Sequence, residues 1–247
     1  MRLLLANPNT TQAVTDMVAA AACRTASPGT EIIARTGRFG AAVIGTRAEL
    51  AVAEHASLDL LAREAAGCDA AIIAASTDSG LRAARELLDG PVLGLTESAL
   101  HIACLLGARF GTLTLSARSA AILREMIDGY GLAARCAAQR CAEATPQALL
   151  ADPQGVTALL AVQAKTLVAE GADCVVLIGA VMADRTEAIE AKLGVPVIEG
   201  VSCAVLLAEA LVRLRRPPPR SGSFSRLAGR CSTGLDPGLA ALLMGGG

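Results

Sequence analysis

Short apolar runs alternate with longer amphipathic stretches along most of the chain. The apolar runs predict strands at residues 2–6, 31–35, 70–75, 91–95, 109–115, 132–138, 174–178 and 196–198. Helical spacing of apolar residues predicts helices at residues 11–24, 46–66, 81–88, 98–106, 117–130, 156–170, 183–193 and 201–215. The strands are continuously apolar, which is typical of parallel strands covered on both faces. The pattern therefore predicts an α/β protein with parallel sheets.

The chain contains an internal repeat. Residues 67–75 (Gly-Cys-Asp-Ala-Ala-Ile-Ile-Ala-Ala) are similar to residues 171–179 (Gly-Ala-Asp-Cys-Val-Val-Leu-Ile-Gly), and each copy predicts a strand, a turn and a helix. Two such α/β halves that face each other place the ends of equivalent strands on opposite walls of one cleft. Ligands of open α/β sheets bind at the carboxyl ends of the strands, so residues 75–80 and 179–183 are predicted to line the site.

Composition and charge exclude several classes of protein. Apolar residues make up 53% of the chain and charged residues 18%, which is enough apolar material for a core. The net charge of −1 excludes a charge-driven nucleic-acid binder. Polar residues interrupt every apolar run before the roughly 20 residues that a membrane span needs. We therefore expect a soluble protein that binds a small molecule, with no nucleic acid and no membrane as partner.

The cysteines and the start of the chain indicate a cytoplasmic location. The first apolar run ends at Asn7, too early for the apolar core of a signal peptide. The 8 cysteines form no Cys-x-x-Cys pair and have no histidine at metal spacing, so no metal site is predicted. We interpret most of these thiols as small buried hydrophobic groups in a reducing cytosol.

The first candidate site follows the first predicted strand, at Asn7-Pro8-Asn9-Thr10-Thr11. The side chains of Asn9, Thr10 and Thr11 could cap the following helix, and the backbone amides could hold a carboxylate or an imide. Both interpretations remain open from the sequence.

The second candidate site is the polar turn at residues 75–80, whose sequence is Ala-Ser-Thr-Asp-Ser-Gly. Its polar members are Ser76, Thr77, Asp78 and Ser79, and Gly80 ends it. Burial in a dry cleft would raise the pKa of Asp78 toward neutrality and suit it to act as a general base. The alternative is that Asp78 or Ser79 only caps the next helix.

Further polar groups are predicted near the cleft. Glu97 and Glu199 could act in the site, or could cap or anchor the starts of helices. Hydroxyl groups are also expected there from Thr96, Thr114 and Ser116. Cys203, in the first turn of a predicted helix, is the one thiol that we retain as a candidate.

At this point the chain resembles the aspartate/glutamate/hydantoin racemase superfamily, and most closely its hydantoin-racemase-like branch. The resemblance covers nearly the whole chain. The motifs that carry it are at residues 7–11, 78–81, 91–97, 194–201, 221–224, 233–235 and 239–243.

The resemblance implies two pseudo-symmetric α/β domains, an active site between them and no cofactor. In racemases of this family two cysteines face each other across the substrate, and one removes the α-proton while the other returns a proton to the opposite face. The positions that match these cysteines are Ala75 and Gly179, which the internal repeat also makes equivalent. Neither residue has a titratable side chain, so the usual two-thiol proton transfer is not expected.

Three functions are compatible with this departure from the family pattern. The first is a cofactor-independent racemase or epimerase of a small amino-acid derivative or hydantoin, with Asp78 and Ser76 as catalytic residues. Its substrate, a carboxylate or cyclic imide, would be bound by Asn9, Thr10, Thr11, Thr77, Ser79, Gly80, Gly179 and Ala180. The second is a decarboxylase, isomerase or hydrolase on the same scaffold. The third is an inactive small-molecule binder.

The expected domain organisation follows from the repeat and the tail. Residues 1–97 together with 200–216 should form the first α/β domain, residues 98–199 the second, and residues 217–247 a C-terminal tail. The proline run at residues 217–219 should end the last helix of the body as a stiff linker. The tail contains leucines at helical spacing, at positions 235, 239, 242 and 243. We expect these leucines to pack either on the chain itself or on a neighbouring subunit. On that ground we predict a homo-oligomer.

Overall fold

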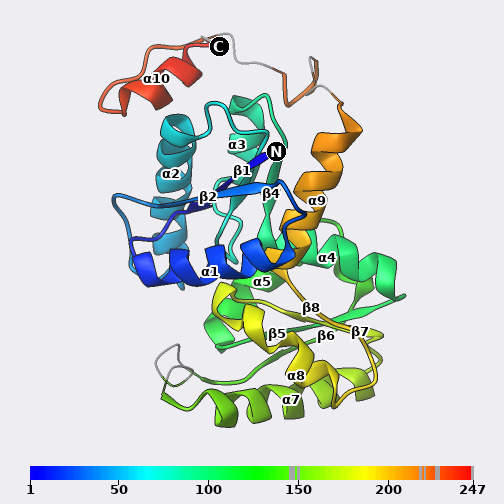
Figure 1. Ribbon diagram of the computed structural model, residues 1–247. Helices are drawn as coiled ribbons and strands as arrows, with labels where there is room; N and C mark the ends of the chain where they lie inside the picture. The colour runs from blue at the N-terminus through cyan, green and yellow to red at the C-terminus, as the bar shows by residue number, and fades with distance from the viewer. Residues whose placement is uncertain (145–147, 149–150, 217–218, 220, 226–228, 246–247) are drawn as a thin grey trace.

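Two four-stranded parallel sheets form the framework of the computed structural model, which describes residues 1–144, 148, 151–216, 219, 221–225 and 229–245. The first sheet, in the upper part of Figure 1, has the order β2-β1-β3-β4 and the second, in the lower part, the order β6-β5-β7-β8. All neighbouring strands pair in parallel. The predicted fold class is therefore confirmed.

The first sheet and the helices that follow its strands come from residues 2–106. The strands are β1 (Arg2–Asn7), β2 (Glu31–Thr36), β3 (Ala70–Ile73) and β4 (Val92–Gly94). The helices are α1 (Gln12–Thr25), α2 (Arg47–Glu64), α3 (Leu81–Leu87) and α4 (Leu95–Leu106).

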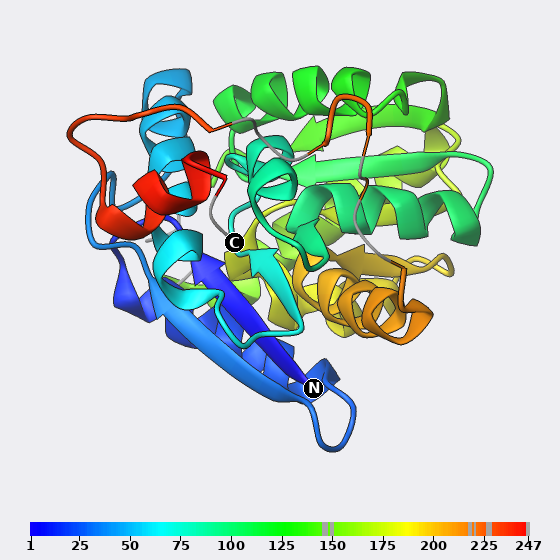
Figure 2. The same cartoon turned by 90° about the horizontal axis from the view of Figure 1, so that it is seen from above.

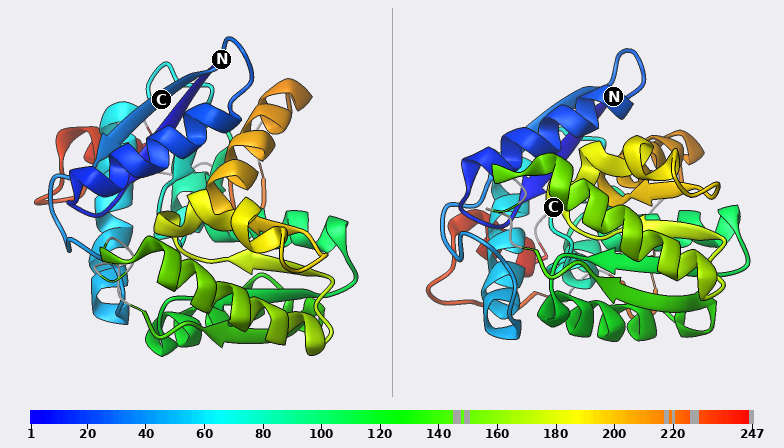
Figure 3. Two further views of the ribbon diagram at one scale, coloured as in Figure 1. Left: turned by 60° about the horizontal axis from the view of Figure 1, so that its bottom comes forward. Right: turned by 90° about the horizontal axis from the view of Figure 1, so that it is seen from below.

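The second sheet and its connections come from residues 110–199. The strands are β5 (Phe110–Thr114), β6 (Cys136–Cys141), β7 (Cys174–Leu177) and β8 (Val197–Glu199). The helices are α5 (Ala117–Gly129), η1 (Ala133–Arg135), α7 (Pro153–Ala169), η2 (Ala180–Arg185) and α8 (Thr186–Glu190). Figure 3 shows α7 crossing the outer face of this sheet.

Two helices cross between the halves. Helix α4 follows the first sheet, yet its Leu100 packs with Phe110 and Val176 of the second. Helix α9 (Gly200–Leu214) follows the second sheet, yet its Val205 packs with residues of the first. The two helices are in close contact at their first turns, where a Cβ on Gly200 would lie 2.6 Å from that of Leu95. This exchange holds the halves together, while the domain boundaries proposed above stay a prediction.

The C-terminal helix α10 (Pro237–Leu243) lies against α2 of the same chain (Figures 1 and 2). Leu239 is buried there with 2% of its surface exposed. The tail leucines thus contact the body of the same chain. They no longer argue for self-association, and the homo-oligomer stays a prediction. Of the predicted linker 217–219, residues 217 and 218 lie outside the described residues.

Some predicted boundaries were wrong. The strand expected at 132–138 begins only at Cys136, after a 3-10 turn, because β6 is a half-buried edge strand without a continuous apolar run. The helix expected at 183–193 divides into η2 and α8. The strand expected at 91–95 ends at Gly94, and the helix expected from residue 98 already begins at Leu95. This last error has a tertiary cause, because the groups that cap α4 come from a distant loop.

Candidate active site

A cavity of about 260 Å³ lies where the carboxyl ends of the two sheets meet, and we call it the substrate cavity. Ala75 and Gly179, the two positions made equivalent by the repeat, both line it. Its described lining consists of Asn9, Val14, Val43, Ile44, Gly45, Ala74, Ala75, Ser76, Thr77, Leu115, Ser116, Ser119, Ile122, Leu123, Met126, Ala144, Ile178, Gly179, Ala180 and Val181. The structure therefore brings the ends of β3 and β7 to one site, as the repeat suggested.

Asn9 presents an amide to this cavity. Asn7, which is fully buried, donates from Nδ2 to Asn9 Oδ1 over 2.9 Å, and the backbone N–H of Thr11 donates to the same oxygen over 2.9 Å. The Asn9 oxygen is thus occupied, which orients the Nδ2 group as the free donor. Asn9 is only 8% exposed and lines the cavity. A ligand carbonyl or carboxylate could accept a hydrogen bond from it.

Thr10 and Thr11, which were predicted to bind the substrate, instead contact a neighbouring loop. The backbone N–H of Thr10 donates to the Ala41 carbonyl over 3.1 Å, and Thr11 Oγ1 donates to the Ala42 carbonyl over 2.8 Å. Neither threonine belongs to the described lining of the substrate cavity. They fasten the loop at residues 37–46, whose members Val43, Ile44 and Gly45 form one wall of that cavity.

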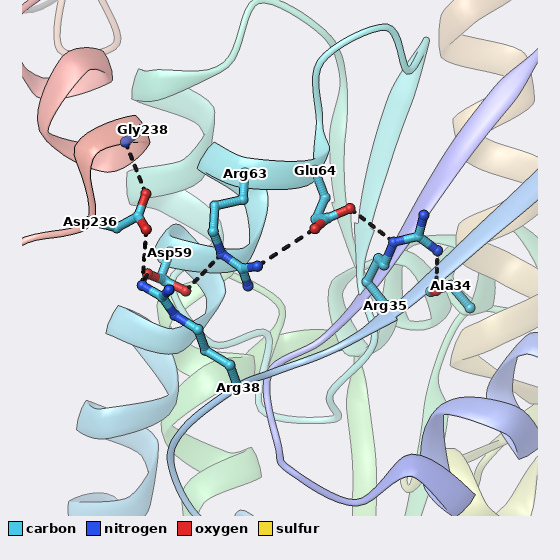
Figure 4. A network of polar contacts seen from close by, with 8 residues as sticks. All are labelled: Ala34, Arg35, Arg38, Asp59, Arg63, Glu64, Asp236 and Gly238. Atoms are coloured by element: carbon cyan, nitrogen blue, oxygen red, sulfur yellow. Dashed lines mark hydrogen bonds and ion pairs between the residues drawn. The ribbon is translucent and has the colours of Figure 1, made fainter.

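The same loop is held at its start by an ion-pair network that includes the C-terminal segment (Figure 4). Arg38 contacts Asp59 of α2 over 2.6 Å and Asp236, the N-cap of α10, over 3.0 Å. Asp59 also accepts from Arg63 over 3.3 Å. At the other end of the loop, Thr46 and Glu49 form a capping box at the start of α2. The loop is therefore tied at both ends.

In the polar turn at 75–80, only part of the predicted set faces the cavity. Ser76 and Thr77 line it. Ser79 is fully buried and forms a hydrogen bond with the Thr77 hydroxyl over 2.7 Å. Gly80 has a positive φ of 77° at the start of α3 and lies outside the described lining. Ser79 and Gly80 thus shape the turn, and Ser76 and Thr77 are placed to meet a ligand.

Asp78 points away from the substrate cavity and caps α4. Its carboxylate accepts hydrogen bonds from the backbone N–H groups of Thr96 over 3.0 Å and Glu97 over 2.8 Å, and from the Tyr130 hydroxyl over 2.7 Å. Gly94 makes this approach possible, because a Cβ there would collide with the carboxylate. Asp78 therefore has the contacts of a helix cap, but it caps α4 and not α3, the helix that directly follows the turn. The catalytic role of Asp78 stays a prediction.

Burial dominates the ionisation of Asp78. The side chain is 5% exposed, and desolvation raises its pKa to about 7, against the hydrogen bonds from Tyr130, Glu97 and Thr96, which lower it. Burial and the neighbouring Asp78 raise the pKa of the Tyr130 hydroxyl, which remains a donor.

The two predicted glutamates have structural partners. Glu199 accepts from the backbone N–H groups of Val201 over 2.5 Å and Ser202 over 2.7 Å and so caps α9. Glu97 forms an ion pair with Arg85. For both residues the contacts agree with the anchoring interpretation.

The thiols lie away from the cavity. Cys203 packs in the core beside α4, and burial raises its pKa to about 12. Burial likewise raises the pKa of Cys174 to about 11. None of the described lining residues is a cysteine, and none has a side chain that ionises near neutral pH. The polar groups are the Asn9 amide and the hydroxyls of Ser76, Thr77, Ser116 and Ser119.

The backbone at Gly179 differs from that of an ordinary strand end. Its φ of 151° is one that residues with a side chain rarely adopt, and a Cβ there would lie 3.0 Å from Met182 Cε. The backbone conformation and the nearby Met182 therefore both disfavour any side chain at position 179.

Sequence reasoning missed several residues of the site. Ser119, Met126 and the wall formed by residues 43–45 have no distinctive motif. Ser116 was recognised only as a hydroxyl, yet it caps α5 by accepting from the Ser119 N–H over 3.2 Å. Its position at the start of the helix after β5 corresponds to that of Thr11 after β1, and this correspondence could have identified it.

Two negative findings concern the part of the chain that the structure describes. No cluster of three or more His, Cys, Asp or Glu residues there is arranged to hold a metal ion. Within the same residues, no helix combines the length and apolar character needed to span a membrane.

Comparisons with known proteins agree with this geometry. The family model described as Asp/Glu/Hydantoin racemase matches residues 3–208. A hydantoin racemase of Pseudomonas sp. (strain NS671) is 35% identical over 219 residues, which is 87% of each chain. The allantoin racemase from Klebsiella pneumoniae superposes with a TM-score of 0.91 at 33% identity, over 97% of this chain and 98% of that one. The allantoin racemase of Pseudomonas fluorescens gives a TM-score of 0.91 at 32% identity, over 95% and 100% of the two chains. The chain therefore belongs to the Asp/Glu/hydantoin racemase family.

Proposed function

We propose that the protein is a racemase or epimerase that binds a small, uncharged cyclic amide of the hydantoin type and exchanges the proton at its stereogenic carbon. The observation that carries this proposal is the substrate cavity, which Ala75 and Gly179 both line and whose described walls are mostly apolar, with a few uncharged polar groups and no charged side chain. The similarity to hydantoin and allantoin racemases supports the same substrate class.

The lining favours an uncharged ring over a free amino acid. Burying an unpaired carboxylate or ammonium group is very costly, and no charged side chain among the described lining residues could compensate it. The carbonyl and N–H groups of a cyclic amide need only neutral partners. Asn9, Ser76 and Thr77 supply such donors and acceptors.

The reaction needs a proton acceptor other than the two thiols. Ser76 borders the position of Ala75 and faces the cavity, so we assign it to contact with the substrate. Asp78 does not line the described cavity, so it enters the proposal in two ways: as the cap that holds the turn of Ser76 in place, or as a base that reaches the substrate by turning away from α4. Its pKa of about 7 would favour the second role. Thr96 Oγ1 donates to the Ser76 carbonyl over 2.7 Å, which links the cap to the turn.

The test is proton NMR in D₂O with the purified protein and a panel of 5-substituted hydantoins, allantoin, amino acids and small dicarboxylates. We expect the signal of the proton on the stereogenic carbon to disappear for the cyclic amides only, because deuterium from the solvent replaces that proton. The same assay on Asp78→Asn distinguishes the two roles of Asp78. If Asp78 is the base, exchange disappears while ligand binding persists, and if it is only the cap, both weaken together. Exchange with amino acids alone would contradict the proposed substrate class.

A second candidate is a binding protein without turnover. It is favoured by the lack of a side chain that ionises near neutral pH among the described lining residues. This candidate predicts calorimetric binding of the cyclic amides with no deuterium incorporation and no loss of compound. Disappearance of the compound with formation of a different product would instead indicate a decarboxylase, isomerase or hydrolase.

We also propose that the protein works in a reducing compartment such as the cytosol. All 8 cysteines are free thiols, and those at positions 174 and 203 are buried. A homo-oligomer remains part of the proposal, and light scattering of the purified protein tests it directly.

A further inference from the structure

One wall of the substrate cavity is a loop without regular structure. Residues 37–46 connect β2 with α2 and contain no helix or strand, and Val43, Ile44 and Gly45 of this loop line the cavity. Because the loop lacks the backbone ladder of a helix or a sheet, its contacts with the rest of the chain hold it in place. The shape of the cavity therefore depends on those contacts.

Arg38, at the start of the loop, contacts two acids from different parts of the chain (Figure 4). Its Nη2 atom lies 2.6 Å from Oδ1 of Asp59 in α2 and 3.0 Å from Oδ2 of Asp236, which is 198 residues further along the chain. The two carboxylates are largely shielded from solvent, with 3% and 12% of their side-chain surfaces exposed. Shielding from water strengthens the attraction between opposite charges. Arg38 thus joins the loop to α2 and to the C-terminal segment, residues 229–245.

Asp236 is held firmly on its side of this contact. Its Oδ1 atom accepts from the Gly238 N–H over 2.9 Å and so caps α10, which leaves Oδ2 for Arg38. Helix α10 packs on α2, and Leu239 is buried there. The Gly238 N–H and the Arg38 guanidinium both lower the pKa of Asp236, so the carboxyl group is ionised at neutral pH. The negative charge opposite Arg38 is therefore fixed in place.

The C-terminal segment does not itself line the substrate cavity, since none of its described residues belongs to the described lining. Any effect of the segment on the site therefore passes through its neighbours, and Arg38 is the loop residue to which it is bonded. Other contacts of the loop come from nearer in the chain. The ring centroid of Phe39 lies 5.1 Å from that of His55 in α2, for example.

We propose that Asp236 is a positioning residue for substrate binding: through Arg38 it holds the loop at residues 37–46 in the place where the loop forms a wall of the substrate cavity. The inference rests on the proposed function, because it assigns the substrate to that cavity. When the loop leaves this place, the fraction of molecules competent to bind falls, and the apparent dissociation constant rises in proportion. Asp236 touches no reacting atom, so kcat stays the same.

The test compares wild type with Asp236→Asn in the exchange of 5-methylhydantoin with solvent, followed by proton NMR in D₂O. Asparagine keeps the helix cap, because its amide oxygen still accepts from Gly238, and it removes only the charge opposite Arg38. We expect KM to rise by up to about fivefold with kcat unchanged, as the loss of a partly exposed ion pair allows. Arg38→Met should raise KM at least as much, and adding Asp236→Asn to it should raise KM no further, because both act through one contact.

Glu31→Gln is the matched control. Glu31 forms an ion pair with Arg2 over 3.1 Å at the start of β2, whereas the loop follows the end of the same strand. This variant loses one ion pair of the first sheet but none of the loop, so its KM should equal that of wild type.

Hydrogen exchange measured by mass spectrometry adds a readout that needs no substrate. In ligand-free Asp236→Asn the amides of residues 38–44 should exchange faster than in wild type, while those of β1 keep their rate. Unchanged exchange in the loop would refute the positioning role.

The outcomes separate this inference from the proposed function. If wild type exchanges 5-methylhydantoin and KM is the same in Asp236→Asn, the proposed function stands and the positioning role is refuted. The positioning role is also refuted if Glu31→Gln raises KM as much as Asp236→Asn does. If wild type neither exchanges nor binds 5-methylhydantoin, the proposed function fails. Faster hydrogen exchange in the loop of Asp236→Asn would then still support its attachment to the C-terminal segment.

Discussion

The two halves of the molecule cap their crossing helices in different ways. At the start of α9, Glu199 precedes the helix and accepts from the N–H groups of Val201 and Ser202. At the equivalent start of α4 the cap is Asp78, a residue from the turn after β3 that reaches across to Thr96 and Glu97. One cap is local in sequence and the other is formed only by the fold. The remote cap connects helix α4 with the turn that carries Ser76 and Thr77.

The two halves also differ at Ala75 and Gly179, the positions that the internal repeat makes equivalent. Ala75 is a buried residue at the end of β3, whereas Gly179 has the positive φ that favours glycine. The backbone is therefore suited to a side chain at Ala75 but not at Gly179. The site is therefore less symmetric than the repeat in the sequence suggests.

Asp78→Ala should have the largest effect on stability. It leaves two backbone N–H groups and the Tyr130 hydroxyl without their acceptor, and we expect a loss of about 3 kcal/mol, or about 9 °C in melting temperature. Glu199→Ala removes only the local cap and should cost about 2 kcal/mol. Urea denaturation of the two variants checks the difference. Equal losses would mean that the remote cap contributes no more than the local one.

Cysteine substitutions at positions 75 and 179 test the difference between the two backbones. Gly179→Cys should cost about 2 kcal/mol, because the new side chain must adopt the positive φ and displace Met182. Ala75→Cys adds one atom beside the cavity and should cost less than about 1 kcal/mol. Thermal melts of both variants test this order. A stable Gly179→Cys protein would show that the backbone there relaxes easily.

The pKa of Asp78 predicts a pH dependence of stability. The folded protein keeps the proton up to about pH 7, while the ordinary value of 3.8 applies to the unfolded chain. Between these values the folded state binds more protons, so the free energy of unfolding falls as pH rises, by at most about 1.4 kcal/mol per pH unit. The contribution is complete below about pH 4 and lost above about pH 7. Denaturation series for wild type and Asp78→Asn should differ by this slope, and identical slopes would contradict the raised pKa.

Tyr130→Phe should have the smallest effect. Only one hydrogen bond to Asp78 is lost, so we expect about 1 kcal/mol of destabilisation. That bond lowers the pKa of Asp78, and its removal should move the upper end of the pH window to higher pH. The pH series described for Asp78→Asn measures this shift. A downward shift would show that the hydroxyl does not stabilise the ionised carboxylate.

Local patterns in the sequence were sufficient for much of the architecture. The central strands β1, β3, β5 and β7 are buried along nearly their whole length. The cores of β1, β3 and β7 are continuous apolar runs in the sequence, and in β5 the buried Thr112 and Thr114 alternate with apolar residues. The repeat alone identifies Ala75 and Gly179 as equivalent positions. Edge strand β6 was misplaced because its six residues are only half-buried, so the run that signals a strand is missing.

The direction of individual side chains was beyond the sequence. Nothing in the turn 75–80 indicates that Ser76 faces the cavity while Asp78 turns toward α4, 18 residues later. The loop at residues 37–46 is a wall of the site only because distant residues hold it there. Thr10 and Thr11 donate hydrogen bonds to its backbone carbonyls, and its Arg38 forms ion pairs with Asp59 and Asp236.

The sequence by itself determined the parallel α/β framework and its two similar halves, because burial on two faces and an internal repeat leave marks on neighbouring residues. The tertiary structure alone decided which polar groups line the cavity and which carboxylate caps which helix. These features depend on contacts between residues that are far apart in the chain, and local periodicity does not encode such contacts.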